Sequence, residues 1–204
     1  MPLSAKRVYF DDYVFVVDEN VYEPAEDSFL FAENLKVKEA ETVLDVGTGC
    51  GILGILAAEK ASKVLAVDVN PYAVRCARGN AKLNNVQGKI YCIQGDLFTP
   101  LSKTYKNDVI FFNAPYLPAT EDETESWIRR AWSGGALGRQ IIDRFITEAP
   151  RHLKQIGRVF LMQSTLADVD ETLRRFGCCG MNARVVAEQA LPFFETIKLI
   201  EAQI

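Results

Sequence analysis

The sequence is poor in histidine, because His152 is the one imidazole among 204 residues. Chemistry that needs several histidines is therefore excluded, including zinc sites built from histidine clusters. A Ser-His-Asp triad would have to use His152, which lies in a stretch that we expect to be helical. The five cysteines show no C-x-x-C spacing, which is the pattern of zinc and redox sites. We therefore expect no bound metal, and free thiols in a reducing cytoplasm.

An excess of positive charge is missing as well. Lysine and arginine number 23 against 27 aspartate and glutamate residues, for a net charge of -4. Tight nonspecific binding to nucleic acid needs many cationic side chains, so direct nucleic-acid binding is not favoured, although a local basic patch stays open. No apolar run approaches the roughly 20 residues that cross a bilayer, and residues 1–12 lack the apolar core of a signal peptide. We expect a cytoplasmic protein without a membrane partner.

The sequence does contain an alternation of short apolar strands and helices. Hydrophobic residues make up 49% and charged residues 25%, as in ordinary globular proteins. Strands are expected at residues 42–46, 63–69, 90–94, 109–112 and 158–162. Helices are expected at residues 52–60, 71–83, 139–153 and 167–176. This alternation predicts an α/β fold with a mostly parallel sheet and helices on both faces.

Both ends of the chain depart from this rhythm. Residues 183–187 and 196–201 read as two final strands, which predict an antiparallel hairpin that closes one edge of the sheet. Residues 8–17 read as extended, with a turn in the middle, and residues 28–35 as a short helix. The length fits one domain over residues 1–204, and residues 1–35 would be an N-terminal extension of it.

A glycine-rich loop follows the first of the buried strands. Gly47, Gly49 and Gly51 stand between that strand and the next helix, where glycines permit a tight turn and a close approach to a ligand. Asp68 ends the next strand, where a carboxylate can accept hydrogen bonds from ribose hydroxyls. An ordinary tight turn would also explain the glycines alone. With Asp68, the pattern favours a nucleotide cofactor, and both NAD and S-adenosylmethionine fit.

Two features favour S-adenosylmethionine over NAD. Counted from Gly47, the glycine spacing is G-x-G-x-G rather than G-x-G-x-x-G. In addition, Asp96 and Leu97 follow the third strand, where Asp96 could accept from the adenine amino group and Leu97 could cover the ring. A turn cap is the alternative for Asp96. We expect S-adenosylmethionine as the cofactor and regard an NAD oxidoreductase as a minor alternative.

The motif that indicates the chemistry stands at the end of the fourth strand: Asn113-Ala114-Pro115-Tyr116. It resembles the Asn-Pro-Pro-Tyr motif of amino-methyltransferases, with Ala114 in place of a proline, although an ordinary strand-end turn would also use asparagine and proline. In that family the asparagine side chain and the next backbone carbonyl each accept one N–H of a planar NH2 group. The nitrogen lone pair is thereby aimed at the methyl donor, and no strong base is needed. Ala114 keeps the carbonyl but adds an N–H that needs a partner.

The resemblance extends to one branch of these enzymes, over about residues 8–204. Residues 21–28 (Val-Tyr-Glu-Pro-Ala-Glu-Asp-Ser) and residues 132–145, which include Trp-Ser-Gly-Gly and Gly-Arg, are similar to the HemK-type protein-glutamine methyltransferases in their short archaeal and eukaryotic form. The resemblance implies the class I, Rossmann-like methyltransferase fold, with a mostly parallel seven-stranded sheet and a C-terminal antiparallel hairpin.

The resemblance also implies roles for individual residues. Those at the cofactor would be Tyr22, Glu26, Ser28, Asp45, Gly47, Gly49, Asp68, Asp96, Leu97 and Asn113. The methionine moiety would lie at Asp45 and the two glycines, the ribose at Asp68 and the adenine at Asp96 and Leu97. The target amide would be bound by Asn113, Ala114, Pro115 and Tyr116, of which Asn113, Pro115 and Tyr116 would be catalytic. A plain helix N-terminus, where acids are favoured, is the alternative for Glu26.

The activity implied is N5-methylation of the glutamine in the Gly-Gly-Gln motif of a class I translation release factor. A small zinc-binding activator protein is implied as the partner in a heterodimer. The alternatives left open are an adenine N6 or guanine N2 nucleic-acid methyltransferase, a lysine methyltransferase, and a cofactor-binding scaffold without activity. The acidic residues 121–125 fit a solvated loop, although Arg129, Arg130 and Arg139 could add positive charge to the mouth of the site.

Overall fold

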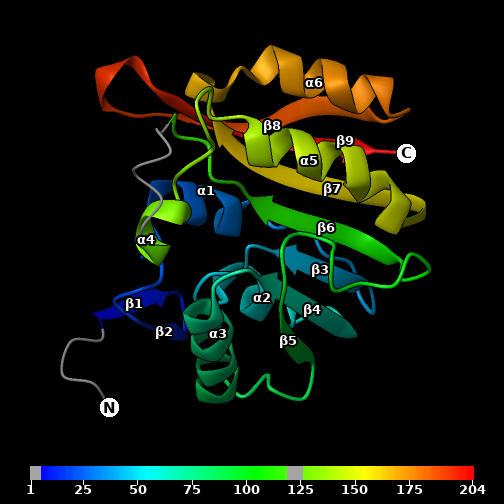
Figure 1. Ribbon diagram of the computed structural model, residues 1–204. Coiled ribbons are helices and arrows are strands. Elements are labelled where there is room, and N and C mark those ends of the chain that lie inside the picture. The colour runs from blue at the N-terminus through cyan, green and yellow to red at the C-terminus, as the bar shows by residue number, and fades with distance from the viewer. Residues whose placement is uncertain (1–5, 119–125) are drawn as a thin grey trace. The chain divides into compact units, whose positions relative to one another are not determined.

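The computed structural model describes residues 6–118 and 126–204. The chain divides into two compact units, Met1–Leu101 and Ser102–Ile204, which are described in turn. Figure 1 labels the helices and strands of both. The elements of the first unit are β1 (Lys6–Phe10), β2 (Tyr13–Val17), α1 (Glu26–Glu33), β3 (Thr42–Val46), α2 (Ile52–Ala57), β4 (Lys63–Asp68), α3 (Pro71–Leu83) and β5 (Ile90–Gln94).

The first unit is built on three parallel strands. Leu44 pairs with Leu65 on β4, and Leu65 pairs in turn with Tyr91 on β5. Valine and leucine fill most of β3 and β4, and they are buried, as expected for strands covered by helices on both faces. Because parallel strands end at one edge, the segments that follow β3, β4 and β5 meet there. These segments contain the glycine loop, Asp68 and Asp96.

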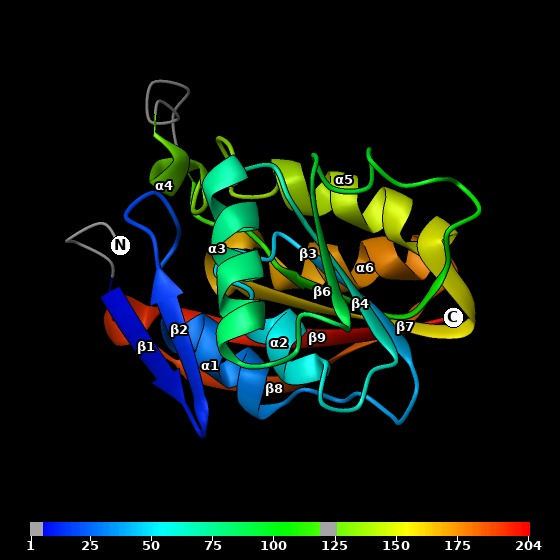
Figure 2. The same cartoon turned by 90° about the horizontal axis from the view of Figure 1, so that it is seen from below.

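The N-terminal extension is fastened to α3, and Figure 2 shows the β1–β2 hairpin beside that helix. The Asn80 side chain accepts from the Val16 N–H at 2.9 Å and donates to the Val16 carbonyl at 3.0 Å. Asn84, one turn further on, binds the N–H and the carbonyl of Val14 in the same way, at 3.0 and 2.8 Å. Alternate residues of β2 thus pair with two amides of α3 much as a strand pairs with its neighbour.

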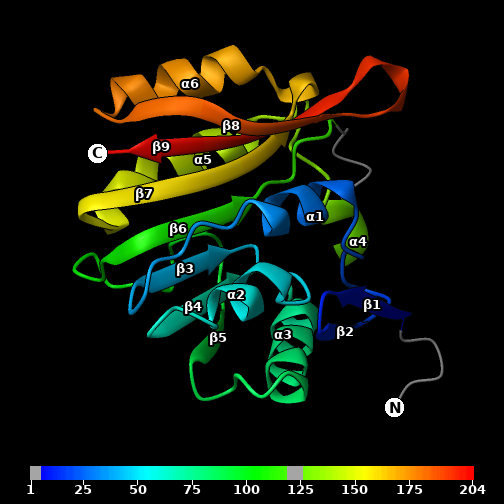
Figure 3. The same ribbon diagram turned by 180° about the vertical axis from the view of Figure 1, so that it is seen from behind.

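The second unit holds the rest of the strands. Its elements are β6 (Asn107–Asn113), α4 (Trp127–Arg130), α5 (Gln140–Glu148), β7 (Leu153–Ser164), α6 (Val169–Cys178), β8 (Asn182–Ala190) and β9 (Thr196–Gln203). The strand order is β6-β7-β9-β8, with β6 parallel to β7 and β9 antiparallel to both of its neighbours. In Figure 3 the β8–β9 hairpin extends past the end of the unit at which β6 terminates.

The expected α/β architecture is confirmed, with three parallel strands in the first unit and four strands that end in an antiparallel hairpin in the second. Some boundaries differ. The helix expected over residues 139–153 ends at Glu148 and a short 3-10 helix, Ala149–His152, follows, because Pro150 lacks the N–H that an α-helix needs. Strand β7 begins at Leu153, earlier than expected. Residues 154–156 are exposed and two of them are polar, so the apolar pattern of the sequence starts only after them. Whether residues 1–204 act as one domain stays a prediction.

No helix within residues 6–118 and 126–204 combines the length and the apolar character that crossing a membrane would require.

Candidate functional site

The glycine loop of the first unit leaves room for a ligand at one position and forms a packing contact at another. Gly49 has φ +57°, and a Cβ at this residue would meet no atom within 4 Å. At Gly51, with φ +92°, a Cβ would lie 3.1 Å from the Ala77 Cβ on α3. The loop is anchored by the Gly47 N–H, which donates to the Val67 carbonyl at 2.8 Å. Gly51 therefore serves close packing, whereas Gly49 faces open space that suits a cofactor.

Asp68 lies against this loop, as expected. Its Oδ2 accepts from the Gly49 N–H at 2.9 Å and its Oδ1 from the Asn70 N–H at 2.8 Å. Burial raises the pKa of the Asp68 carboxyl above its usual value, and the backbone hydrogen bonds partly oppose this. Each carboxylate oxygen has a second lone pair, so both can still accept from a hydroxyl. The residue expected at the ribose is thus fixed in orientation and chemically able to bind it.

Asp45 is a fully buried carboxyl at the end of β3. Its Oδ2 accepts from Thr48 Oγ1 at 2.6 Å and from the Gly54 N–H at 3.1 Å. Its Oδ1 is buried and accepts no hydrogen bond from any described residue. Burial raises the pKa of Asp45 to about 7, despite the lowering effect of these hydrogen bonds. A buried oxygen without a donor is costly, and a polar ligand group could supply that donor.

The turn after β5 places Asp96 and Leu97 beside the Asp68 segment. The Gly95 N–H donates to the Asp68 carbonyl at 2.9 Å, and the Thr99 N–H to the Asp96 carbonyl at 3.0 Å. Leu97 is buried and has φ +49°. This left-handed conformation is costly for a leucine and recurs at ligand sites. The segment expected at the adenine therefore carries backbone strain.

The segment before α1 is organised by Asp27, which the sequence reasoning did not place in the site. Asp27 Oδ1 accepts from the Tyr22 hydroxyl at 2.9 Å and from the Ser28 N–H at 2.5 Å. Tyr22 and Ser28 are thus brought together, while Glu26 begins α1 and is exposed. The Asn70 side chain donates to the Asn20 carbonyl at 2.8 Å, which fastens this segment to the turn after Asp68. Asp27 could have been noticed in the sequence, because it lies in residues 21–28 together with Tyr22, Glu26 and Ser28.

Gly54 is a second residue that the sequence reasoning missed. Its N–H donates to Asp45, and a Cβ would lie 2.9 Å from Asp45 Oδ2. A side chain at this position would therefore press on the buried carboxyl. Counted from Gly49, the glycines have the G-x-G-x-x-G spacing, with Gly51 and Gly54 as the second and third members. The glycine spacing therefore does not favour S-adenosylmethionine over NAD, and Asp96 and the motif at Asn113 carry that distinction.

The segment at Asn113 in the second unit leaves β6 opposite Met162. Ala114 is buried, and its N–H donates to the Met162 carbonyl at 3.3 Å. The N–H that a proline would lack therefore has a partner here. The alanine is accommodated by one further hydrogen bond to β7, which ties the backbone of the motif to the sheet.

Residues 132–138 form a wall for the segment after the motif. The Leu117 N–H donates to the Trp132 carbonyl at 2.9 Å, and the Gly134 N–H to the Leu117 carbonyl at 2.9 Å. Gly138 has φ +70°, and a Cβ there would collide with the Tyr116 carbonyl oxygen. The glycines of the family-like segment are thus explained by close approach of two backbones.

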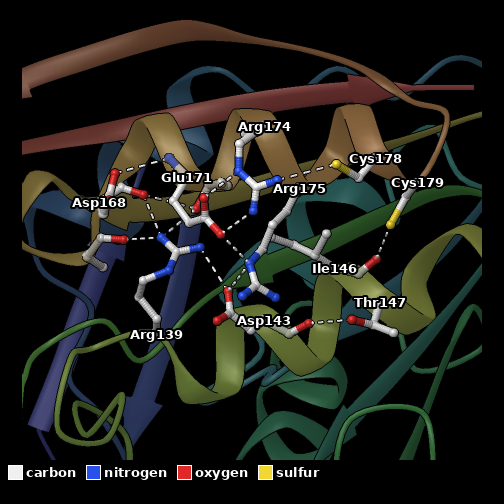
Figure 4. A network of polar contacts seen from close by, with 12 residues as sticks. Arg139, Asp143, Ile146, Thr147, Asp168, Glu171, Arg174, Arg175, Cys178 and Cys179 are labelled. Carbon is white, nitrogen blue, oxygen red and sulfur yellow. Dashed lines mark hydrogen bonds and ion pairs between the residues drawn. The ribbon is translucent and has the colours of Figure 1, made fainter.

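Arg139 directly follows residues 132–138 and ties them to the turn after β7, and Figure 4 shows its contacts. The buried guanidinium donates through Nη1 to the carbonyls of Ala167 and Asp168, and through Nη2 to Asp143 Oδ1 at 2.8 Å. Arg175 makes a second ion pair with Asp143 at 3.4 Å. The hypothesis that Arg139 adds positive charge to the mouth of the site is wrong, because its side chain is buried in the network that joins α5 to the turn after β7.

Other expected surface features of the second unit are only partly described. The acidic residues 121–125 lie outside the described residues. Arg129 and Arg130 are exposed on α4, and the Arg130 guanidinium lies over the Trp127 ring at 5.0 Å. In the described part of the chain, no group of three or more His, Cys, Asp or Glu side chains is placed to hold a metal ion.

Comparisons with known proteins indicate the family to which this chain belongs. The model of the methyltransferase small domain family matches residues 23–188. A putative protein N5-glutamine methyltransferase of Methanocaldococcus jannaschii is 46% identical over 177 residues, which are 86% of this chain and 88% of that protein. Methyltransferase HEMK2 of Mus musculus is 31% identical over 188 residues, which cover 84% of this chain and 87% of that protein.

Solved structures show the same fold. Mtq2 of E. cuniculi, described in complex with Trm112 as responsible for methylation of the termination factor eRF1, has a TM-score of 0.70 and 26% identity, with 90% of this chain and 98% of that chain covered. The tRNA-bound aTrm5 has a TM-score of 0.73 at 20% identity, with 100% of this chain and 54% of that chain covered, which shows a shared fold alone. The family model and the curated relatives together place the chain: it belongs to the methyltransferase small domain family and, within it, to the HemK-type methyltransferases.

Proposed function

We propose that this chain transfers a methyl group from S-adenosylmethionine to the side-chain amide nitrogen of the glutamine in the Gly-Gly-Gln motif of a class I translation release factor. The observation that carries the proposal is the 46% identity, over most of both chains, to a protein named as a putative protein N5-glutamine methyltransferase. The Asn113–Tyr116 motif supports it, because the same residue types hold a planar amide in the family that it resembles.

The first unit supplies the groups that would hold the cofactor. Asp68 would accept from the ribose hydroxyls, Asp96 and Leu97 would bind the adenine, and Asp45 with Gly47 and Gly49 would bind the methionine moiety. Tyr22, Glu26 and Ser28 would complete this set from the N-terminal extension. The fit rests on the open space at Gly49 and on the unsatisfied Oδ1 of Asp45. When bound, S-adenosylmethionine supplies an electrophilic methyl group on a sulfonium.

The second unit supplies the groups that would hold the substrate amide. The Asn113 side-chain carbonyl and the Ala114 backbone carbonyl would each accept one N–H of the glutamine NH2. This orients the nitrogen lone pair and lets the nitrogen become tetrahedral as the bond to the methyl group forms. Pro115 and Tyr116 would pack beside the planar amide. The excess proton leaves after transfer, when the nitrogen is acidic, so no strong base is required.

A partner protein is part of the proposal. Mtq2 is described in complex with Trm112, and we propose that this chain likewise forms a heterodimer with a small zinc-binding activator. The activator would cover an apolar surface of the methyltransferase. Because the activator is a separate chain, its contribution is measured by adding it to the assay.

The experiment is transfer of a labelled methyl group from S-adenosylmethionine, with and without the activator. The acceptors are a class I release factor with the Gly-Gly-Gln motif, its Gln→Ala variant and transfer RNA. We expect label in the release factor and none in the Gln→Ala variant. Label in transfer RNA alone would refute the protein substrate. Cofactor binding without transfer to any acceptor would refute catalysis and favour a scaffold.

The role of Asn113 gives a prediction at the same site. Asn113→Ala should lower transfer by roughly 10²–10³-fold, the usual loss when one preorganised polar group is removed from a reacting centre. Binding of S-adenosylmethionine, measured by calorimetry, should stay near the wild-type value. Asn182→Ala is the matched control, because Asn182 is exposed at the start of β8. A collapse of cofactor affinity would instead show that Asn113 acts mainly in binding the cofactor rather than on the acceptor amide.

A further inference from the structure

Exposed apolar side chains gather at one edge of the second unit. In the part of this unit that the structure describes, five of the seven exposed large hydrophobic residues lie in segments that follow β6, β7 or β8. They form what we call the apolar rim: Trp132, Leu137, Leu166, Phe193 and Phe194. The other two, Ile156 and Ile204, lie at the opposite edge, where the Ile204 N–H meets the Gly157 carbonyl. Apolar exposure concentrated in this way is typical of an interaction surface.

The rim is continuous with the segment that follows Asn113. Trp132 accepts from the Leu117 N–H, as described above. Arg139 joins the following wall to the turn at Ala167, next to Leu166. The Thr196 N–H, after the hairpin tip, donates to Thr165 Oγ1 at 3.1 Å. A series of hydrogen bonds thus runs from the motif, through each of the three segments, to the hairpin tip.

The hairpin tip presents its two aromatic rings to solvent. The exposed fractions of Phe193 and Phe194 are 95% and 105%, the highest among the exposed hydrophobic residues described. Both have positive φ, +62° and +64°, a costly conformation for residues with a large side chain. The Leu191 N–H closes the tip by donating to the Glu195 carbonyl at 2.8 Å. Two exposed rings on a strained backbone bury nothing in this chain, so their packing does not explain the conformation.

We propose that the apolar rim docks the protein substrate, with Phe193 and Phe194 as the anchoring side chains; this rests on the proposed function. The partner would be the release-factor domain that carries the target glutamine. Aromatic side chains are enriched at protein interfaces. A partner held on the rim also reaches the Asn113 segment, because the two lie at the same edge of the unit. The rim thus adds affinity for a folded protein that the small motif does not provide.

Charge favours a protein over a nucleic acid at the hairpin. Two ion pairs neutralise basic side chains on β8 and β9. Lys198 pairs with Glu188 at 2.8 Å, and Arg184 pairs with Glu201 at 2.9 Å. Stacking platforms for single-stranded nucleic acid combine aromatic rings with a positively charged groove. Near the rings, Lys198 is paired with Glu188 and the acidic Glu195 follows Phe194, which suits the apolar side chains of a protein partner better than a phosphate backbone.

The experiment uses the full chain with its activator and the double variant Phe193→Ala/Phe194→Ala. We expect the KM for the release factor, and its dissociation constant by calorimetry, to rise about tenfold or more, as at interface hot spots. The value of kcat at saturating factor should be unchanged, because neither ring contacts the reacting atoms in the proposal. Ile156→Ala, which removes an exposed side chain at the opposite edge, is the control and should leave both constants unchanged.

The outcomes separate the rim from the proposed function. Wild-type transfer with an unchanged KM in the double variant would overturn the rim and leave the function standing. If the wild-type protein binds the release factor without transferring a methyl group, and the double variant does not bind it, the rim is supported and the function is refuted. Absence of both binding and transfer refutes both. An effect of the double variant confined to RNA binding would overturn the rim as a substrate surface. So would loss, in sedimentation, of the complex with the activator or of a dimer of this chain. The melting temperature of the variant checks that it is folded.

Discussion

At the scale of a residue, the buried carboxyl of Asp45 lowers the stability of the folded protein, because one of its oxygens lacks a hydrogen-bond donor among the described residues. One carboxyl oxygen accepts from Thr48 and Gly54, while the other accepts from no described residue. Burial of the charged form is unfavourable, which raises the pKa to about 7. The folded protein therefore holds a proton on Asp45 at pH values where the unfolded chain has lost it.

The sign of the pH dependence follows from this pKa. The ordinary value is 3.8 and the folded value about 7, so between about pH 4 and 7 the folded state binds more protons than the unfolded state. The free energy of unfolding of the ligand-free protein should therefore fall as pH rises through this window, by at most about 4 kcal/mol at about 1.4 kcal/mol per pH unit. Urea denaturation at several pH values should show a shallower fall for Asp45→Asn. The control is Asp170→Asn, at an exposed position on α6. Parallel curves for wild type and Asp45→Asn would contradict the assignment.

At the scale of an element, the β1–β2 hairpin depends on two asparagines of α3. Asparagine is a poor helix former, yet Asn80 is buried in the middle of the helix and bonds to Val16 and to the Cys50 carbonyl. The same side chain therefore touches the N-terminal extension and the glycine loop. Asn84 repeats the contact with Val14 one turn later. The helix thus gives up intrinsic stability to hold a strand.

Replacing Asn80 by alanine removes this partner from the Val16 N–H and from the Cys50 carbonyl, whereas the Val16 carbonyl still accepts from the Cys76 thiol at 3.0 Å. We expect a loss of about 2–4 kcal/mol in the free energy of unfolding, because each buried polar group left unsatisfied costs about 1–3 kcal/mol and the alanine gains helix propensity. Hydrogen exchange should show faster exchange at the Val16 amide. Lys82→Ala, on an exposed position of the same helix, should change neither property. Unchanged exchange at Val16 would show that the hairpin is held by other contacts.

At the scale of the whole molecule, cofactor binding should be visible as stability. A ligand that binds only the folded state at 100 times its dissociation constant adds about 2.7 kcal/mol to the free energy of unfolding. For a chain of 204 residues this corresponds to a rise in melting temperature of about 5–10 °C. Thermal unfolding with S-adenosylmethionine should show the rise, and NAD should not. Asp68→Ala should reduce the shift. A shift with NAD alone would reverse the assignment of the cofactor.

How much of the candidate site could be predicted from the sequence differs between the residues of the first unit and those of the second. Gly49 and Asp68 come together as expected, because the carboxyl ends of neighbouring parallel strands meet at one edge. The partner of the Ala114 N–H could not be predicted, since Met162 is distant in the sequence. Asp27 and Gly54 lie in segments that the sequence singled out. Their contacts with Tyr22 and Asp45 could not be predicted, because they depend on the folded backbone.

The amino-acid sequence alone is enough to predict the order of strands and helices, the glycine loop, the acids at the strand ends and the motif at Asn113. These are local signals, carried by hydrophobic periodicity and by residues a few positions apart. The burial of Arg139, the hold of Asn80 on β2 and the shared edge of five exposed apolar residues from three segments become evident only in the folded chain. The physical reason is that burial and contact depend on which distant segments meet, and residue type alone does not state this.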